Sequence, residues 1–254
     1  MDGLRFAFGT LTVLPARITR WDRDAARSGM LWAPLAGLVV GLLSAALGGV
    51  FLLLGAGPLL AAVITTAVPA LLTRGLHLDG LADTADGLGS AKPAEDALRI
   101  MKRSDIGPFG VVVLLLTLLA QVAALSRLYG EGWAPGTVAA ALAATVARLA
   151  LTHASRAGVP AARPEGLGAI VASTVPARAA TLVTGLVLLL CAAAGALFSP
   201  YDAVRYVLAA GAGLGAAALL LRRCVRRFGG VTGDVFGAVE ETAATAVLVA
   251  LTLG

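Results

Sequence analysis

We predict an all-α, polytopic integral membrane protein, and three features of the sequence lead to this class. Hydrophobic residues make up 58% of the 254-residue chain, charged residues only 14%, and the mean hydropathy is +0.88. Soluble domains carry about 25% charged residues. The apolar residues form runs of about the 17–25 residues that cross a bilayer as a helix. Because the runs lack the alternation of barrel strands and unpaired backbone is costly in lipid, helices are expected.

About seven such runs divide the chain, and we expect them to form a single membrane domain over residues 1–254. They lie near residues 30–54, 58–73, 109–126, 134–152, 179–198, 203–221 and 235–253. Pro34 in the first run predicts a tilt, a kink or a frayed start. The spacings Gly37 to Gly41 and Gly211 to Gly215 predict close helix contacts.

The basic residues predict the orientation of these runs. Seventeen of the 20 Lys and Arg residues fall in the amino-terminal segment and in alternate loops, whereas the other loops contain only Arg127 and Arg205. Because basic loops stay inside, we expect a cytoplasmic amino terminus and an outside carboxyl terminus. Cations in a membrane chain mark such loops and lipid headgroups, so nucleic acid is not an expected partner. Assembly into a homo-oligomer stays open.

A cluster of aspartates follows the second apolar run, in "RGLHLDGLADTADGLG". If residues 78–87 continue that run as a helix, Asp79, Asp83 and Asp86 lie at i, i+4 and i+7 on one face. No Lys or Arg occurs between Arg74 and Lys92 to balance them. Crowded carboxylates favour Mg²⁺ or Mn²⁺, which in turn favours a phosphate ligand. The alternative is a water-exposed helix end whose aspartates only cap and solubilise it.

Two other segments are expected on the same side. In "SAKPAEDALRIMKRSDIG", Pro93 and the following acids predict a helix start, while Ala94, Ala97, Leu98 and Met101 predict an apolar stripe lying on the membrane interface. In "RRCVRRFGGVTGD", a glycine turn precedes Thr232 and Asp234. Such a turn offers backbone N–H groups, a hydroxyl and a carboxylate beside a phosphate. The arginines of this segment are interpreted mainly as topological signals.

These motifs together resemble one family. "GLHLDGLADTADGLG", then "RIMKRSDIGPFG", and near the end "GGVTGDVFGAVEE" are similar to the cobalamin synthases, adenosylcobinamide-GDP ribazoletransferases. "TLTVLPAR" and "PLAGLVVGLL" extend the resemblance over nearly the whole chain. The resemblance implies that α-ribazole, or its 5′-phosphate, attacks the cobinamide-proximal phosphate of adenosylcobinamide-GDP. GMP leaves, adenosylcobalamin or its 5′-phosphate forms, and Mg²⁺ is required. A bacterial cytoplasmic membrane, with the site facing the cytoplasm, is the expected location.

The expected site combines these residues. Asp79, Asp83 and Asp86 are assigned to the metal, and Asp234 serves as a further ligand or accepts a ribazole hydroxyl proton. The candidate substrate-binding residues are His77, Lys102, Arg103, Ser104, Gly230, Thr232 and Gly233. His77 falls on the opposite helix face from the aspartates, which favours a packing role. Arg103, Ser104 and Asp105 reverse the family's Asp, Ser, Arg order, which leaves the individual roles of Arg103 and Asp105 unassigned.

Two other functions remain as alternatives. Glu240, Glu241 and Arg148 fall inside predicted spans, where ionisable residues suggest a cation or metabolite transporter. Transporters often consist of two related halves with paired broken helices, and the sequence shows no such repeat. Each of the three residues also lies near the end of a span, where a local ion pair or snorkelling explains its charge. A CDP-alcohol-type lipid phosphotransferase shares metal-binding aspartates, but its motif is DxxDG followed by GxxxDxxxD. This chain has DxxxDxxDG without the second half.

Overall fold

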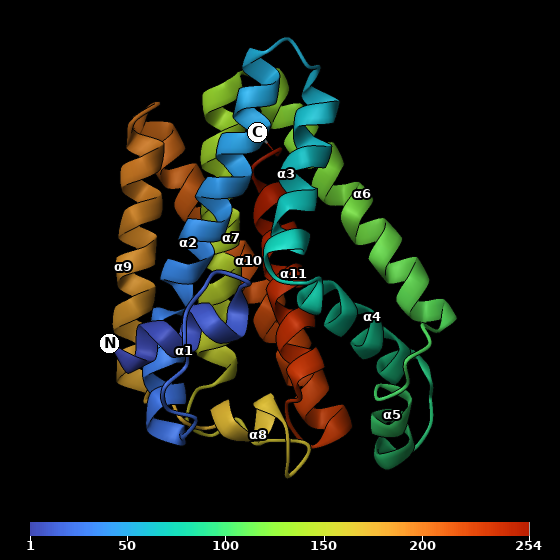
Figure 1. The fold of residues 1–254 in the computed structure, drawn as a ribbon. Helices are drawn as coiled ribbons and strands as arrows, with labels where there is room; N and C mark the ends of the chain where they lie inside the picture. The colour runs from blue at the N-terminus through green and yellow to red at the C-terminus, as the bar shows by residue number, and fades with distance from the viewer. Residues whose placement is uncertain (254) are drawn as a thin grey trace.

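The protein is an all-helical bundle in the computed structural model, which describes residues 1–253 (Figure 1). Helices of the described chain are α1 (Asp2–Leu11), α2 (Arg23–Leu53), α3 (Pro58–Leu72), α4 (Leu76–Gly89), α5 (Ala94–Ile100), α6 (Pro108–Gly130), α7 (Trp133–Ala154), α8 (Leu167–Val171), α9 (Ala177–Ala196), α10 (Pro200–Phe228) and α11 (Gly233–Ala250). Residues 1–253 contain two isolated β-bridges, which pair Arg156 with Val175 and Ala161 with Val231. The predicted class is therefore confirmed.

Local capping explains where several helices begin. The Asp22 carboxylate accepts hydrogen bonds from the backbone N–H groups of Asp24 and Ala25 at the start of α2. This cap starts the helix at Arg23, before the predicted span, and the helix continues through Pro34. Proline occupies the first position of α3, α6 and α10, where the missing N–H costs nothing.

A helix occupies each of the seven predicted apolar runs, but fewer qualify as membrane spans. Five helices are long and apolar enough to cross a membrane: α2, α6, α7, α9 and α10. A sixth span results only if α3 and α4 are joined across a 90° bend. Helix α3 alone has 15 residues, or about 22 Å of rise, which is short of a ~30 Å hydrocarbon core. Helix α11 carries Asp234, Glu240 and Glu241. The predicted count of seven is therefore not confirmed.

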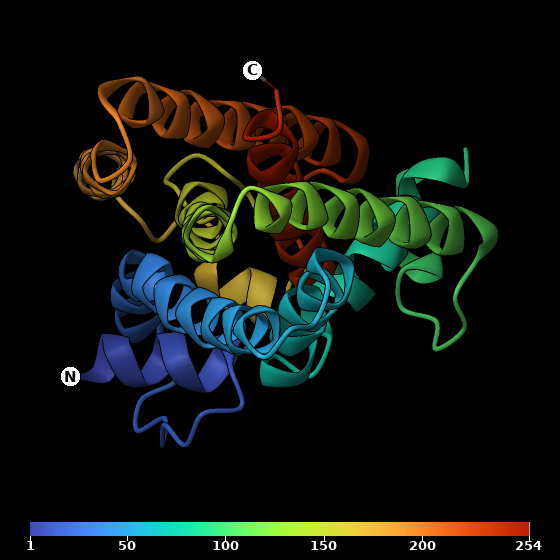
Figure 2. The same cartoon turned by 90° about the horizontal axis from the view of Figure 1, so that it is seen from above.

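Helix α7 lies at the centre of the bundle, with α2, α9 and α10 around it (Figure 2). Its residues are small where α2 crosses it: a Cβ added to Gly37 would come within 2.4 Å of the Ala144 carbonyl oxygen, and one on Gly41 within 2.8 Å of Ala141 Cα. The close contact predicted for this glycine pair is confirmed. The prediction for Gly211 and Gly215 is wrong, because an added Cβ there would meet nothing within 4 Å.

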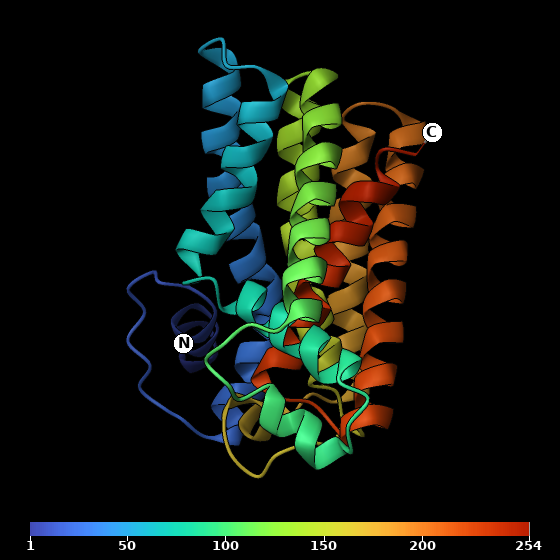
Figure 3. The same cartoon turned by 90° about the vertical axis from the view of Figure 1, so that its right-hand side faces the viewer.

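The basic segments gather at one end of the bundle. The amino-terminal helix, α4, α5 and α8 lie at this end, while the α2–α3 and α6–α7 connections lie at the other (Figures 1 and 3). Helix α5 packs on α4 rather than lying on the interface. Ala97 and Met101 of its apolar stripe are buried, and Met101 lies against Gly87 of α4. Protein covers these two residues, while Ala94 is exposed and Leu98 partly buried, so the prediction that the whole stripe lies on the membrane interface is corrected for Ala97 and Met101.

Candidate active site

The aspartate segment forms a helix of its own and does not continue α3. Arg74 and Gly75 adopt left-handed backbone angles, with φ of 57° and 67°, and this region favours glycine over other residues. The chain therefore turns by 90° before α4. The predicted helix over residues 78–87 is present, but it lies across the basic end of the bundle, and we treat α4 as outside the spanning segments.

Helix α4 crosses α11 at two glycines, which brings the two acidic motifs together. A Cβ on Gly80 would lie 2.6 Å from the Asp234 carbonyl oxygen, and one on Gly237 would lie 2.8 Å from the His77 carbonyl oxygen. Only glycine permits backbones to approach this closely. Asp79 and Asp83, on either side of Gly80, consequently share one region with Asp234.

The three aspartates of α4 have different surroundings. Asp86 is buried, and its two carboxylate oxygens accept hydrogen bonds from Gly107 N–H at 2.8 Å and Gly110 N–H at 2.9 Å. The Asp86 side chain on α4 therefore caps the first turn of α6, more than twenty residues later in the sequence. Asp79 is exposed and Asp83 half-buried, and neither side chain has a hydrogen-bond or ion-pair partner among residues 1–253.

Electrostatics single out Asp83. Burial and the neighbouring carboxylates of Asp79, Asp234 and Asp86 raise the pKa of Asp83 to about 7, and the positive charge of Arg163 has the smaller, opposite effect. Burial and the neighbouring carboxylates each disfavour the charged carboxylate. A cation placed among the carboxylates would remove the repulsion.

Arg163 is a site residue that the sequence reasoning treated only as part of a basic loop. Its Nη1 lies 3.6 Å from Asp234 Oδ2, and its Nη2 donates to the Leu98 carbonyl oxygen at 2.5 Å. The guanidinium is mostly buried, at 18% exposure. No local signal in the sequence connects the 155–176 loop to the aspartates, because the two meet only through the fold.

The GGVTGD segment is a fixed turn rather than a flexible one. A Cβ on Gly230 would lie 2.4 Å from the Pro160 carbonyl oxygen, and Val231 exchanges backbone hydrogen bonds with Pro160 and Ala162. Thr232 caps α11 by accepting from Val235 N–H at 3.3 Å, and its hydroxyl donates to Asp234 Oδ2 at 3.1 Å. Gly233 begins α11, with nothing within 4 Å of an added Cβ. The segment thus holds Asp234 in place.

The residues after α5 divide into two groups. Arg103, Ser104 and Asp105 line a cavity of about 330 Å³ together with Asp79 and Asp83. Arg103 and Asp105 therefore both face the aspartates, despite their reversed order. Lys102 does not line this cavity and instead pairs with Glu165 at 3.6 Å.

His77 lies away from that cavity, in a buried polar cluster between α4, α6, α7 and α11. Its Nδ1 is 2.5 Å from Glu241 Oε1, although the two groups are not aligned as a hydrogen bond. Gln121 donates to Glu241 Oε2 at 2.5 Å. Arg148 Nη2 lies 2.6 Å from Glu240 Oε1. These acids are thus paired inside the protein, as the local-pair interpretation predicts, and they do not snorkel.

Mg²⁺ fits the donor set of α4. Magnesium is held in proteins by one or two carboxylates together with substrate phosphates and water, and Asp79 and Asp83 are two unpartnered carboxylates beside a cavity. Across the described chain, one group of three His, Cys, Asp or Glu side chains has all its ligand atoms within 4.8 Å: His77, Glu240 and Glu241. The two glutamates of that group already have protein partners, because Arg148 pairs with Glu240 and Gln121 donates to Glu241. Asp79, Asp83 and Asp86 are not gathered so tightly, and Asp86 has both oxygens engaged.

Comparison with known proteins identifies the family. A family model described as cobalamin-5-phosphate synthase matches residues 3–252. Adenosylcobinamide-GDP ribazoletransferase of Frankia casuarinae is 44% identical, over 98% of this chain and 94% of the relative. The enzymes of the same name from Nocardioides sp. and Bradyrhizobium diazoefficiens are 41% and 38% identical, over 98% and 96% of this chain and 97% and 91% of theirs. No solved structure matches. The chain belongs to the cobalamin-5-phosphate synthase family.

Proposed function

We propose that this protein is an enzyme of cobalamin biosynthesis that transfers the adenosylcobinamide-phosphate group of adenosylcobinamide-GDP to α-ribazole or its 5′-phosphate. A ribazole hydroxyl oxygen forms the new bond to the cobinamide-proximal phosphorus, the bond to the bridging oxygen breaks, and GMP leaves. The family match over residues 3–252 is the observation that carries the proposal. The relatives' names state the same transfer.

The site has the parts that this reaction needs. Phosphoryl transfer depends on positioning and on charge neutralisation more than on covalent help from the protein. Asp79 and Asp83 would hold Mg²⁺, which supplies neutralisation of the diphosphate charge when bound. Arg163, 3.6 Å from Asp234, and Arg103, which lines the cavity with Asp79 and Asp83, would contact phosphate oxygens. Asp234, held by Thr232 and Arg163, is placed to accept the proton of the attacking hydroxyl.

The cytoplasmic orientation of this site belongs to the same proposal. The aspartates, Arg163 and the GGVTGD turn all lie at the end of the bundle where the basic segments gather, and basic segments stay inside.

The other two hypotheses have little support. The intramembrane acids that suggested a transporter are paired with Arg148, His77 and Gln121, so they need no transported cation. The aspartate arrangement of a CDP-alcohol phosphotransferase is missing its second half, and the family match is to another class.

The proposed function is tested by supplying purified, lipid-reconstituted protein with adenosylcobinamide-GDP, α-ribazole and Mg²⁺. We expect release of GMP in equal amount with a product that carries the ribazole base, identified by mass spectrometry. Parallel reactions with a CDP-alcohol and a diacylglycerol acceptor should give no product. GMP release that does not require ribazole, or cobalamin formation at the level of empty vesicles, would contradict the proposal.

A further inference from the structure

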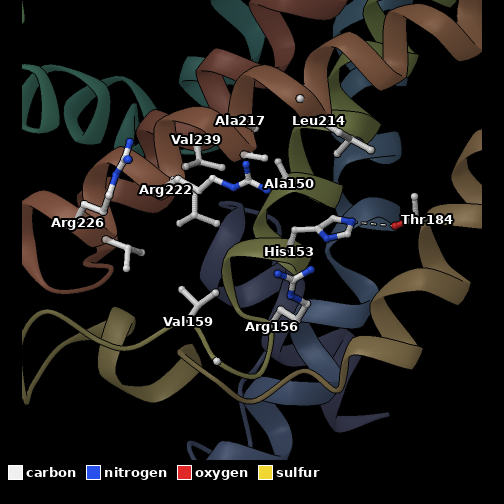
Figure 4. Close-up of a pocket in the computed structure, with 15 residues that line it drawn as sticks. Ala150, His153, Arg156, Val159, Thr184, Leu214, Ala217, Arg222, Arg226 and Val239 are labelled. Atoms are coloured by element: carbon white, nitrogen blue, oxygen red, sulfur yellow. Dashed lines mark hydrogen bonds between the residues drawn. The ribbon is translucent and has the colours of Figure 1, made fainter.

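A second cavity lies away from the aspartates, between α7, α9 and α10 (Figure 4). Its volume is about 600 Å³, within the ~300–1,000 Å³ range of small-molecule sites. None of Asp79, Asp83, Arg163 or Asp234 lines it. The cavity is therefore separate from the candidate active site.

One end of the cavity is basic. Arg222 and Arg226 lie one turn apart near the end of α10, and Arg156 follows the end of α7. None of these three forms an ion pair within residues 1–253. Figure 4 shows the Arg222 guanidinium directed toward Ala150, and Arg156 beside His153. His153 is held by a 2.8 Å contact between its Nε2 and Thr184 Oγ1.

The wall extending away from the arginines is apolar. It is formed by Ala150, Leu214, Ala217, Ala218, Leu221 and Val239. Leu214 and Arg226 are twelve positions apart on α10, which is about 18 Å by the rise of an α-helix. The cavity therefore has cations at the bundle end and apolar surface toward the middle of the membrane.

The cavity is open on its bilayer side. Gly215 and Ala218 on its wall are exposed, and the flanking Leu186 of α9 and Leu219 of α10 are 68% and 67% exposed. Large apolar side chains exposed to this extent on both helices indicate surfaces covered by lipid. A molecule can consequently enter from the bilayer, between α9 and α10.

We propose that this cavity binds an anionic phospholipid. The headgroup phosphate would lie against Arg222, Arg226 and Arg156, because arginine presents a fork of donors to phosphate oxygens. The glycerol region would lie near His153 and Thr184, and an acyl chain along Ala217, Leu214 and Gly215. A phospholipid matches both the length and the polarity of the cavity, and its source is the membrane itself.

Native mass spectrometry of the full-length protein with added phosphatidylglycerol or phosphatidylcholine tests this proposal. We expect preferential binding of phosphatidylglycerol. The double variant Arg222→Gln, Arg226→Gln should weaken this binding at least about tenfold, since each basic residue at a membrane surface is worth about a factor of five. The double variant Arg223→Gln, Arg227→Gln is the matched control. It removes two charges from the same helix end at positions that do not line the cavity.

A second pair of variants tests the apolar part without changing charge. Gly215→Phe should fill the cavity and lower phosphatidylglycerol binding, whereas Gly211→Phe, one turn away and outside the cavity, should not. An added Cβ meets nothing within 4 Å at either position, so both variants should fold. Equal lipid binding in the Arg222→Gln, Arg226→Gln variant and in the Arg223→Gln, Arg227→Gln variant would overturn the proposal. So would equal binding in the two Phe variants, or competitive displacement of the lipid by α-ribazole 5′-phosphate, which would make the cavity a substrate site.

Discussion

His77 Nδ1 on α4 lies 2.5 Å from Glu241 Oε1 on α11, and this buried contact joins the helix that carries Asp79 and Asp83 to the helix that carries Asp234. His77 is two residues before Asp79, and Glu241 is about two turns after Asp234. The contact therefore fixes the distance between the two halves of the site from inside the protein. His77 acts here as a positioning residue and does not face the cavity that Asp79 and Asp83 line.

We expect His77→Ala to destabilise the protein by about 3–5 kcal/mol, because it leaves a buried carboxylate without one of its partners. The measurement is thermal or denaturant unfolding of purified protein in one detergent. Replacing both partners, as His77→Leu with Glu241→Leu, should recover part of the loss. A double variant as unstable as the sum of the single variants would show that the two residues are not coupled.

The aspartates of α4 should separate into two functions. Asp83→Asn should lower turnover a hundredfold or more, corresponding to about 3–4 kcal/mol of lost transition-state stabilisation, and should weaken the response to Mg²⁺. Asp86→Ala should instead reduce stability by about 0.5–2 kcal/mol, the cost of a lost helix cap, with the Mg²⁺ midpoint unchanged. GMP release against Mg²⁺ concentration, at matched protein levels, distinguishes the two. Wild-type turnover in Asp83→Asn at an unshifted midpoint would rule out its metal role.

Arg163 should contribute to the reaction through its fork of donors. Arg163→Lys keeps one positive charge but cannot contact both Asp234 and the Leu98 carbonyl oxygen as the guanidinium does. We expect about a tenfold to hundredfold loss of kcat/KM, in line with one charge-assisted contact of ~1.5–3 kcal/mol. Arg178→Lys, in the first turn of α9, is the control. Equal rates for the two variants would mean that Arg163 acts only as a basic residue that orients the chain in the membrane.

The α4–α11 crossing should be intolerant of a methyl group. Gly80→Ala would place a Cβ 2.6 Å from the Asp234 carbonyl oxygen, so the helices must separate, at a cost of about 1–3 kcal/mol. Activity should fall with stability, because Asp79 and Asp83 move with α4. Gly211→Ala, where an added Cβ meets nothing within 4 Å, should leave activity unchanged and raise helix stability by up to about 1 kcal/mol. A stable and fully active Gly80→Ala protein would contradict the close backbone contact of α4 and α11 at Gly80.

Cysteine labelling tests the orientation. Glu95→Cys, at the end of the bundle that holds the site, should react with a membrane-impermeant maleimide only after the cytoplasmic face is opened. Glu131→Cys, between α6 and α7, should react from outside in intact cells. Both glutamates are exposed or partly exposed in ordinary helical or turn conformations, and the native Cys191 and Cys224 are buried. Labelling of Glu95→Cys in intact cells would place the site on the outer face.

Much of the fold was predictable because the sequence patterns that specify it lie within single segments of the chain. Apolar runs predict helices wherever lipid or protein covers them, and the helix over Asp79, Asp83 and Asp86 follows from spacing within one segment. The cap on α11 likewise follows from Thr232 and its next three residues. Hydropathy and capping each depend on neighbours within a few positions, so the amino-acid sequence alone determined the class, the approximate places of the helices over the apolar runs and the residues that carry charge.

Tertiary structure decided how those residues are used, because their partners are distant in the chain. Asp86, predicted as a metal ligand, meets the N–H groups of Gly107 and Gly110 only because α6 begins beside α4. Arg163 reaches Asp234 only through the turn that pairs Ala161 with Val231. The bend at Arg74 and Gly75 turns α4 across the bundle, and the glycine contact at Gly80 sets its distance from α11. Such pairings depend on backbone packing between helices, which spacing along one helix does not encode.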